Sequence, residues 1–190
     1  MKRFEFSFKG LVGMQKNKGF TLVELSIVLL IISIVTVGIL QVKEMLENSK
    51  VKSVMKDLNG IAVAYYAYKD RVGSIPGDSD NNGKIDVINT FWQDLRREGY
   101  IVGAATDNTP VSHSLQGDIL ALSAAGFNGG NSVCATAILT KYARMIDFQM
   151  DDANPQSGNI RTSDLSAYSA DDEALVTICR ELSSVDSSIF

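Results

Sequence analysis

The sequence is poor in the residues on which small secreted scaffolds and many metalloenzymes depend. Its 190 residues include two cysteines, one histidine and three prolines. Two cysteines exclude a miniprotein held together by many disulfides, and 15 glycines are too few for a collagen-like repeat. A hydrophobic share of 45% excludes a disordered chain. The length instead fits one domain of ordinary size.

Catalytic motifs are also missing. The sequence contains no G-x-S-x-G, no H-E-x-x-H and no clustered set of metal ligands of the catalytic type. His113 lies in a polar stretch between Ser112 and Ser114, which predicts an isolated surface side chain. The chain beyond residue 19 is acidic and has no basic stripe, so we expect no specific nucleic-acid partner. These absences argue against an enzyme.

Charge and hydropathy are distributed unevenly along the chain. Residues 1–19 contain five basic residues and one acidic residue, a net charge of +4, which leaves −8 for the remainder of a chain whose total is −4. Residues 20–40, FTLVELSIVLLIISIVTVGIL, have a single charge at Glu24 and no proline. At about 1.5 Å per residue this run spans roughly 31 Å, the thickness of a bilayer core. It is longer than the apolar core of a cleaved secretory signal. Because basic residues upstream stay in the cytoplasm, we expect the acidic remainder to be exported.

The start of the apolar run carries a specific pattern. The stretch KGFTLVEL, residues 18–25, resembles without a gap the type IV prepilin processing motif, in which a basic leader ends in Gly and a Phe-Thr-Leu-hydrophobic-Glu stretch follows. The resemblance implies that a membrane peptidase cleaves after Gly19 and methylates the amine of Phe20. It also implies that Glu24 pairs with the Phe20 amine of a neighbouring subunit. A carboxylate in an apolar helix is costly, so such pairing would fix the register of assembly.

A single long helix is expected from about Phe20 to Arg71. No proline interrupts the chain before Pro76, and after Leu40 apolar residues recur at spacings of three and four. These residues are Val51, Val54, Met55, Leu58, Ile61, Ala62, Tyr65 and Tyr68. We expect this face to pack on the protein's own globular part. The apolar first half must instead be buried in lipid or against other copies of itself.

The remaining residues, 73–190, are expected to form an exported globular head. Thr90 is a candidate N-cap for a short helix that ends at Arg97, with Phe91, Trp92 and Leu95 facing inward.

Later segments of the head give weaker signals. The β-branched runs 132–140 and 174–179 are compatible with strands or short helices, and 141–150 is compatible with a helix. The glycine-rich stretch 124–132 and the polar stretch 151–172 are expected loops.

Cys134 and Cys179 both lie in the part expected to be exported. Two cysteines in an oxidising compartment predict one disulfide, with two buried free thiols as the alternative. Closing a loop of about 46 residues would stabilise the fold by about 4 kcal/mol in the chain-entropy model. The resemblance to pilins agrees, because pilins carry a C-terminal disulfide. The absence of a CxxC pair argues against a redox or zinc site.

An acidic loop at 78–86 has the spacing of a calcium loop. Positions 1, 3, 5, 7 and 9 would be filled by Asp78, Asp80, Asn82, the carbonyl of Lys84 and Asp86, with Gly83 at the sharp turn. Position 12 is Asn89, where an EF-hand has a bidentate Glu, so the expected Ca²⁺ site is weak. A solvated turn built on Asx and Gly residues is the alternative. No other cofactor is expected.

Three further stretches resemble a subgroup of pilin-like proteins. They are AYYAYKDRVGSIPGD, the FWxxLxxxGYI pattern at 91–101 and YARMIDFQMDDANPQSGNIR at 142–161. In that subgroup a Gly usually follows the Asp pair, where this chain has Ala153. The implied architecture is an α+β pilin-like fold, with a long N-terminal helix packed on a small globular head that has a short antiparallel sheet. Its parts would be a removed leader 1–19, a membrane and filament-core helix 20–40, its amphipathic continuation 41–72 and the head 73–190.

The function implied is that of a structural subunit, major or minor, of a type IV pilus. The alternatives are a pseudopilin of a type II secretion system and a monomeric membrane-anchored binding protein. The implied partners are copies of the chain itself, other pilins, a prepilin peptidase and methyltransferase, an assembly platform protein and its ATPase, and the membrane for the precursor. The precursor would cross the bacterial inner membrane once with its head in the periplasm. The mature chain would lie in a surface pilus or a periplasmic pseudopilus.

Overall fold

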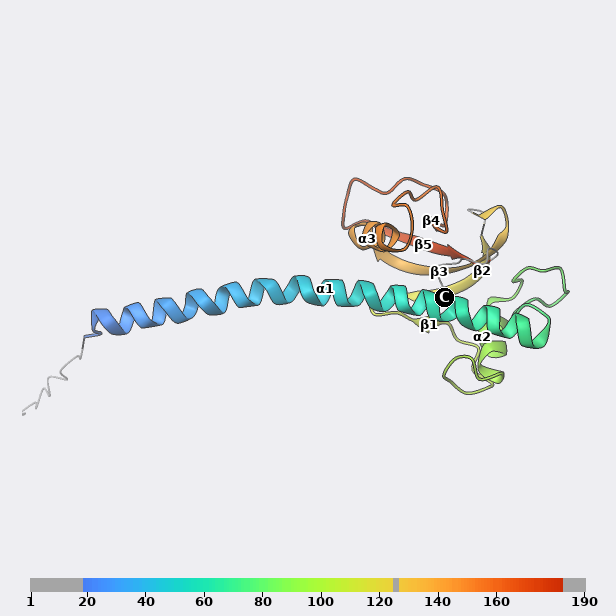
Figure 1. The fold of residues 1–190 in the computed structure, drawn as a ribbon, viewed down its shortest axis with the longest axis horizontal. Helices are drawn as coiled ribbons and strands as arrows, with labels where there is room; N and C mark the ends of the chain where they lie inside the picture. Colours follow the sequence, from blue (N-terminus) through green and yellow to red (C-terminus); the bar gives the residue numbers. More distant parts are fainter. Residues whose placement is uncertain (1–18, 125–126, 183–190) are drawn as a thin grey trace, which may run out of the picture. The chain divides into compact units, whose positions relative to one another are not determined.

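The computed structural model describes residues 19–124 and 127–182, apart from the side chains of residues 40, 41 and 124 (Figure 1). In chain order the elements are α1 (Leu22–Val72), α2 (Ile88–Arg97), β1 (Val111–Ser112), β2 (Asp118–Ala124), β3 (Gly130–Leu139), α3 (Thr140–Met150), β4 (Ile160–Thr162) and β5 (Leu175–Glu181). The protein is therefore α+β, with a long N-terminal helix and an antiparallel sheet, as the resemblance implies. The chain divides into two compact units, residues 1–43 and 44–190, and α1 contributes to both.

The first half of α1 exposes its apolar side chains. The large hydrophobic residues from Phe20 to Ile39 are between 46% and 88% exposed. Polar side chains in this stretch bond back to their own helix: the hydroxyls of Ser26, Ser33 and Thr36 donate to carbonyls three or four residues earlier, at 2.7 Å. Such internal pairing is what a helix in a lipid environment requires.

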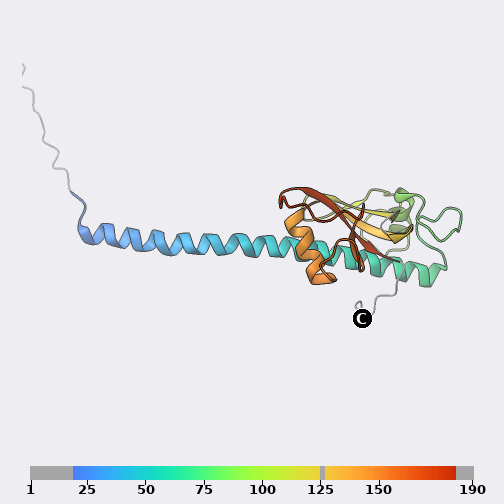
Figure 2. The same ribbon diagram turned by 90° about the horizontal axis from the view of Figure 1, so that it is seen from above.

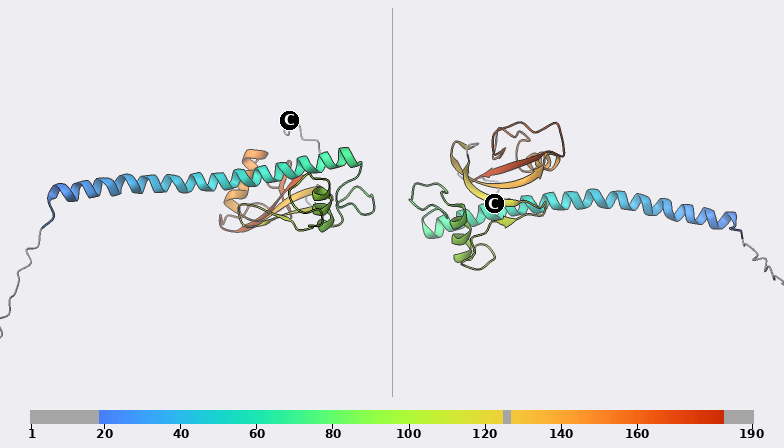
Figure 3. Two further views of the ribbon diagram at one scale, coloured as in Figure 1. Left: turned by 90° about the horizontal axis from the view of Figure 1, so that it is seen from below. Right: turned by 180° about the vertical axis from the view of Figure 1, so that it is seen from behind.

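The second half of α1 packs within the head. The expected apolar face is confirmed, since Val51, Val54, Leu58 and Tyr65 are buried, together with Ile61, Ala62 and Tyr68. The same hydrophobic core contains residues from α2, from the sheet and from α3. Figures 2 and 3 show this part of α1 running alongside the sheet in each view. Within the head, α1 is therefore a core element.

Helix α2 starts earlier than expected, and the prediction that Thr90 caps it is wrong. The N-cap residue is Val87, which has an extended backbone and no side-chain cap. The start is set by the preceding loop, because the backbone N–H groups of Asp86 and Val87 both donate to the carbonyl of Gly77, at 3.1 and 3.2 Å. The expected inward face is confirmed, since Phe91, Trp92 and Leu95 are fully buried.

The five strands pair antiparallel in the order β1-β2-β3-β5-β4. The two β-branched runs left open by the sequence are the central strands β3 and β5, and the stretch 141–150 is helical as part of α3. The expected loop 124–132 lies partly in strands, since β2 ends at Ala124 and β3 begins at Gly130. The expected loop 151–172 also contains a strand, β4, which pairs with β5 over three residues. Strand β2 was not expected from the sequence, because its residues DILALSA are poor in β-branched types.

The sheet has two faces with different neighbours. Successive residues of a strand point to opposite faces of the sheet. Val133 and Ala135 on β3 and Ile178 on β5 therefore lie on one face, and Cys134 and Cys179 lie on the other. The first set belongs to the main hydrophobic core, which includes α1. The two cysteines form a separate small cluster with Phe127 on the other face. The sheet therefore carries the helix on one side and the cysteine pair on the other.

His113 is buried rather than on the surface, so the prediction of an exposed side chain is wrong. Only 6% of it is exposed, and its Nε2 lies 2.9 Å from the carbonyl of Thr136. The backbone N–H of Leu115 donates to Nδ1 at 3.2 Å, which fixes the neutral tautomer with the proton on Nε2. Thr136 lies in a bulge of β3 where the register with β5 shifts and Ala137 has φ of +55°. The His113 side chain therefore gives the carbonyl of Thr136 a hydrogen-bond partner, which the bulge removes from the backbone ladder.

Candidate functional site

The residues at the expected cleavage point lie in an exposed segment. Gly19 and Phe20 precede α1, have no regular secondary structure and are exposed. A Cβ added at Gly19 would meet no atom of the described residues within 4 Å, its two chain neighbours aside. A protease needs an accessible backbone at the bond it cuts, and the exposed residues Gly19 and Phe20 provide one.

Thr21 starts the helix, a role that sequence analysis did not assign. Its Oγ1 accepts a hydrogen bond from the backbone N–H of Glu24 at 3.2 Å, and its carbonyl accepts from the N–H of Leu25 at 3.2 Å. A threonine N-cap three residues before a glutamate is the spacing of a capping box. The Thr-x-x-Glu spacing could have revealed this from the sequence. It places the helix start two residues after the expected cleavage point.

Glu24 lies in the first turn of α1, exposed among apolar side chains. A carboxylate at this position interacts favourably with the positive end of the helix dipole. Within the part of the chain that the structure describes, Glu24 makes no salt bridge.

Comparison with known proteins gives one match. Residues 14–40 match the family model described as the prokaryotic N-terminal methylation motif. This is the type IV pilin class III signal motif. Neither a search of curated proteins nor a search of solved structures finds a significant match.

The methylation motif covers Gly19, Phe20 and Glu24 together. It supports a precursor of the type IV pilin-like or pseudopilin kind. The motif implies a structural subunit, processing by a prepilin peptidase and assembly into filaments. Helix α1 is long and apolar enough to cross a membrane, by length and composition. The motif and the helix together fit a membrane-anchored precursor.

Cys134 and Cys179 form a disulfide between the two central strands. They are direct partners in the antiparallel ladder of β3 and β5 and are fully buried. Phe127 covers them, and the guanidinium of Arg161 lies 4.8 Å from the centre of that ring. The bridge joins strands 45 residues apart in the sequence, so it constrains the unfolded chain as well as the sheet.

The acidic loop 78–86 brings its carboxylates together. Oxygen atoms of Asp78, Asp80 and Asp86 lie within 4.8 Å of one another. Gly83 adopts φ of +84°, the left-handed conformation expected at the sharp turn. This arrangement agrees with the spacing seen in the sequence and equally with a solvated Asx turn.

Hydrogen bonds inside the loop centre on Asn82. Its backbone N–H donates to Asp78 and Asp80, both at 3.1 Å, and its side-chain amide donates to Asp80 at 3.0 Å. The N–H of Gly83 donates to Asp78 at 2.9 Å, and that of Lys84 donates to the Asn82 side chain at 2.8 Å. The loop therefore satisfies its carboxylates with its own donors, and calcium binding here stays a prediction of the sequence.

Asn131, which sequence analysis did not single out, ties this loop to the sheet. Its buried side-chain amide donates to the carbonyl of Gly83 at 2.8 Å and to the hydroxyl of Tyr65 at 3.2 Å. Its oxygen accepts from the N–H of Ile85 at 2.9 Å and from the hydroxyl of Ser123 at 3.0 Å. Burial raises the pKa of Tyr65 above its usual value, although the bond with Asn131 opposes the shift. One side chain thus joins the loop, α1 and the sheet.

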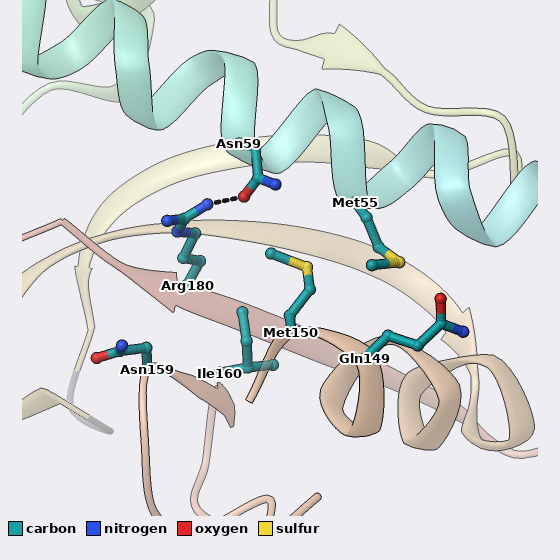
Figure 4. A pocket seen from close by; sticks show the side chains of 7 residues that line it. All are labelled: Met55, Asn59, Gln149, Met150, Asn159, Ile160 and Arg180. Carbon is teal, nitrogen blue, oxygen red and sulfur yellow. Dashed lines mark hydrogen bonds between the residues drawn. The ribbon is translucent and has the colours of Figure 1, made fainter. Parts of the chain in front are cut away.

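A cavity of about 190 Å³ lies between α1, α3 and the edge of the sheet (Figure 4). Met55, Met150 and Ile160 supply its apolar wall, and Gln149 and Asn159 lie at its polar rim. Across it, the guanidinium of Arg180 on β5 hydrogen-bonds the side chain of Asn59 on α1. Small-molecule sites usually enclose about 300–1,000 Å³, so this cavity is an imperfectly filled space between helix and sheet.

Proposed function

We propose that the chain is a structural subunit of a type IV pilus, cleaved after Gly19, methylated at Phe20 and polymerised through the first half of α1. The proposal rests on the methylation motif at the start of this stretch together with the exposed apolar side chains that follow it. The motif supports a pilin-like precursor, and the apolar side chains from Phe20 to Ile39 are exposed in the single chain.

Such a surface cannot be left in water. Full burial of a Val, Leu or Ile side chain contributes about 1.5–3 kcal/mol, so leaving a run of them exposed would be strongly unfavourable. Lipid covers the helix in the membrane-anchored precursor. In a filament, the same helices from neighbouring copies would cover one another. The exchange of lipid contacts for helix contacts exposes no apolar surface to water.

Glu24 would set the position of each subunit in the bundle. Cleavage leaves a positive amine on Phe20, four residues before the carboxylate. Inside an apolar bundle, opposite charges attract strongly and an unpaired charge is costly. A subunit that arrives out of register would leave Glu24 or an amine unpaired. The partner amine would therefore be that of an adjacent copy.

The sequence of events follows from these features. The precursor lies in the inner membrane with its head in the periplasm, because the basic leader stays in the cytoplasm. A prepilin peptidase removes residues 1–19, and an assembly platform protein with its ATPase lifts the chain into the growing filament. The disulfide between Cys134 and Cys179 supports an exported head, since such bonds persist in oxidising compartments. It also favours a durable surface pilus over a periplasmic pseudopilus.

Mass spectrometry of the mature protein tests the processing step. The expected chain begins at methylated Phe20 and lacks residues 1–19. A mature chain that still begins at Met1 would contradict the proposal.

Electron microscopy with antibody to the head tests the destination. We expect label along long external fibres. Label confined to the periplasm would instead indicate a pseudopilin, and label spread over the membrane without fibres would indicate an anchored binding protein.

A further inference from the structure

A second group of acidic residues lies at the C-terminal end of α3. Asp147 is on the last turn of the helix, Asp151 is its C-cap residue and Asp152 follows. One carboxylate oxygen from each lies within 4.8 Å of the other two. The C-terminal end of a helix already carries partial negative charge, so three carboxylates here repel one another and the helix end.

Asp147 is the member of this group that its surroundings do not satisfy. It is fully buried, and its Oδ2 accepts a hydrogen bond from the hydroxyl of Tyr168 at 2.7 Å. Its other oxygen, Oδ1, is also buried and accepts no hydrogen bond from the described residues. A buried carboxylate oxygen without a partner is costly, and it points to a missing positive group.

The other two carboxylates are held in place by the loop that follows. Asp151 accepts from the backbone N–H of Ile160 at 2.8 Å and packs against Gly158, where φ is +75° and a side chain would collide with the carboxylate. Asp152 accepts from the N–H of Asn154 at 2.9 Å and from the hydroxyl of Ser157 at 2.6 Å. The oxygens are thus preorganised before any ligand arrives.

The arginines near this acidic group, Arg161 and Arg144, bind other partners. Arg161 donates to the carbonyl of Gly158 at 2.8 Å and lies over the ring of Phe127. Its charge helps to lower the pKa of Asp152, although the hydrogen bonds from Ser157 and Asn154 contribute more. Arg144 pairs with Asp172 at 3.0 Å. Neither arginine supplies the hydrogen bond that Oδ1 of Asp147 lacks.

We propose that Asp147, Asp151 and Asp152 bind a divalent cation, with calcium preferred over magnesium. All three ligands are hard carboxylate oxygens. Magnesium usually keeps several waters and takes only one or two carboxylates, whereas calcium accepts more protein oxygens in a flexible geometry, so three protein carboxylates favour calcium. The three ligand oxygens all lie within 4.8 Å of one another, close enough to contact one ion. Water would complete the coordination shell.

The loop 78–86 differs from this group in the burial of its carboxylates and in the hydrogen bonds they accept. Its acidic residues are partly or fully exposed, and the amide of Asn82 donates into it. Within the described residues, the buried carboxylate oxygen without a partner belongs to Asp147. We therefore assign calcium to the end of α3 in preference to the loop.

Thermal unfolding of the full-length chain in detergent micelles tests the proposal. After treatment with a chelator, addition of 10 mM CaCl₂ should raise the Tm by several degrees, because a ligand bound only to the folded state stabilises it by mass action. Asp147→Asn should abolish most of that rise. Without calcium this variant should be at least as stable as the wild type, since a neutral amide replaces an unsatisfied charge.

Asp78→Asn in the loop is the matched control and should keep the full calcium response. The proposal is wrong if Asp147→Asn responds like the wild type, if the response is lost in Asp78→Asn instead, or if no chain responds at 10 mM CaCl₂. An equal response to 10 mM MgCl₂ would contradict the preference for calcium.

Terbium luminescence provides a second readout if Asp147→Asn does not fold. Tb³⁺ takes calcium sites and emits when a nearby excited tyrosine transfers energy to it, and Tyr168 directly contacts Asp147. Emission excited through tyrosine should be strong in the wild type, should fall severalfold in Asp151→Asn and should be displaced by excess calcium. Unchanged emission in Asp151→Asn would overturn the assignment.

Discussion

The two halves of α1 differ both in apolar content and in surroundings. Leu29 in the first half is 65% exposed, whereas Leu58 in the second half is fully buried. The first half is apolar all round, and the second is apolar on one face and charged on the other. A helix that is apolar all round cannot be covered by one small domain, so it requires lipid or other helices. Under the proposed function, one continuous helix would serve the filament with one half and its own head with the other.

The largest effect should come from the single charge in the first half. Glu24→Ala should reduce filaments on the cell surface by orders of magnitude, because subunits lose the charge that fixes their register. The amount of mature protein in the membrane and the Tm of the head should stay unchanged. Counting filaments by electron microscopy gives the measurement. Glu44→Ala, further along the same helix, is the control and should assemble normally; normal filaments with Glu24→Ala would refute the role of this residue.

Alanine substitution of one leucine in each half of α1 compares the contributions of the two halves to the stability of the head. Leu58→Ala should lower the free energy of unfolding of the head by about 2–5 kcal/mol, because it removes a buried side chain and leaves a cavity. Leu29→Ala should leave that free energy unchanged within about 0.5 kcal/mol. Denaturant unfolding of both variants in micelles, followed by the fluorescence of Trp92, makes the measurement. Equal losses of the free energy of unfolding in the two variants would contradict the view that only the second half of α1 stabilises the head.

Removal of the disulfide should weaken the head and leave the first half of α1 untouched. The double variant Cys134→Ala with Cys179→Ala should lower the free energy of unfolding by about 2–4 kcal/mol, since the unfolded chain gains freedom over a loop of 45 residues. Membrane insertion and cleavage after Gly19 should be unaffected. Denaturant midpoints under oxidising conditions measure the loss. A wild-type chain treated with reductant should unfold at the midpoint of the variant, and a large gap between them would contradict this account.

The smallest effect concerns a single backbone conformation in the head. Ala153 has φ of +63°, which an L side chain adopts at a cost and which glycine adopts freely. Ala153→Gly should therefore raise the free energy of unfolding by roughly 0.5–1 kcal/mol, after the greater freedom of glycine in the unfolded chain is subtracted. Thermal unfolding measures it. Ala62→Gly, in the middle of α1, is the control and should destabilise instead.

Several parts of the molecule could be predicted because their signals are local. The spacing of Leu58 and Tyr65 identified the buried face of α1, and the stretch 18–25 identified the signal motif. The carboxylates of the 78–86 loop lie together because they are close in the sequence.

Other parts were missed because they depend on distant segments. The burial of His113 follows from the bulge at Thr136, and the start of α2 follows from hydrogen bonds to Gly77. Neither contact has a signature in the neighbouring residues. The role of Asn131 likewise arises only where the loop, α1 and the sheet meet.

The sequence by itself determined the helix, its division into an apolar half and an amphipathic half, and the motif at its start, because each is a repeat or a contiguous pattern along the chain. Only the tertiary structure decided which acidic group lacks a partner. Asp78 and Asp147 are both aspartates in acidic stretches, yet the first is satisfied by its own loop and the second is buried at the end of α3 with one oxygen unpaired. Burial and hydrogen bonding arise from segments brought together by folding, and these decide how much a charge costs.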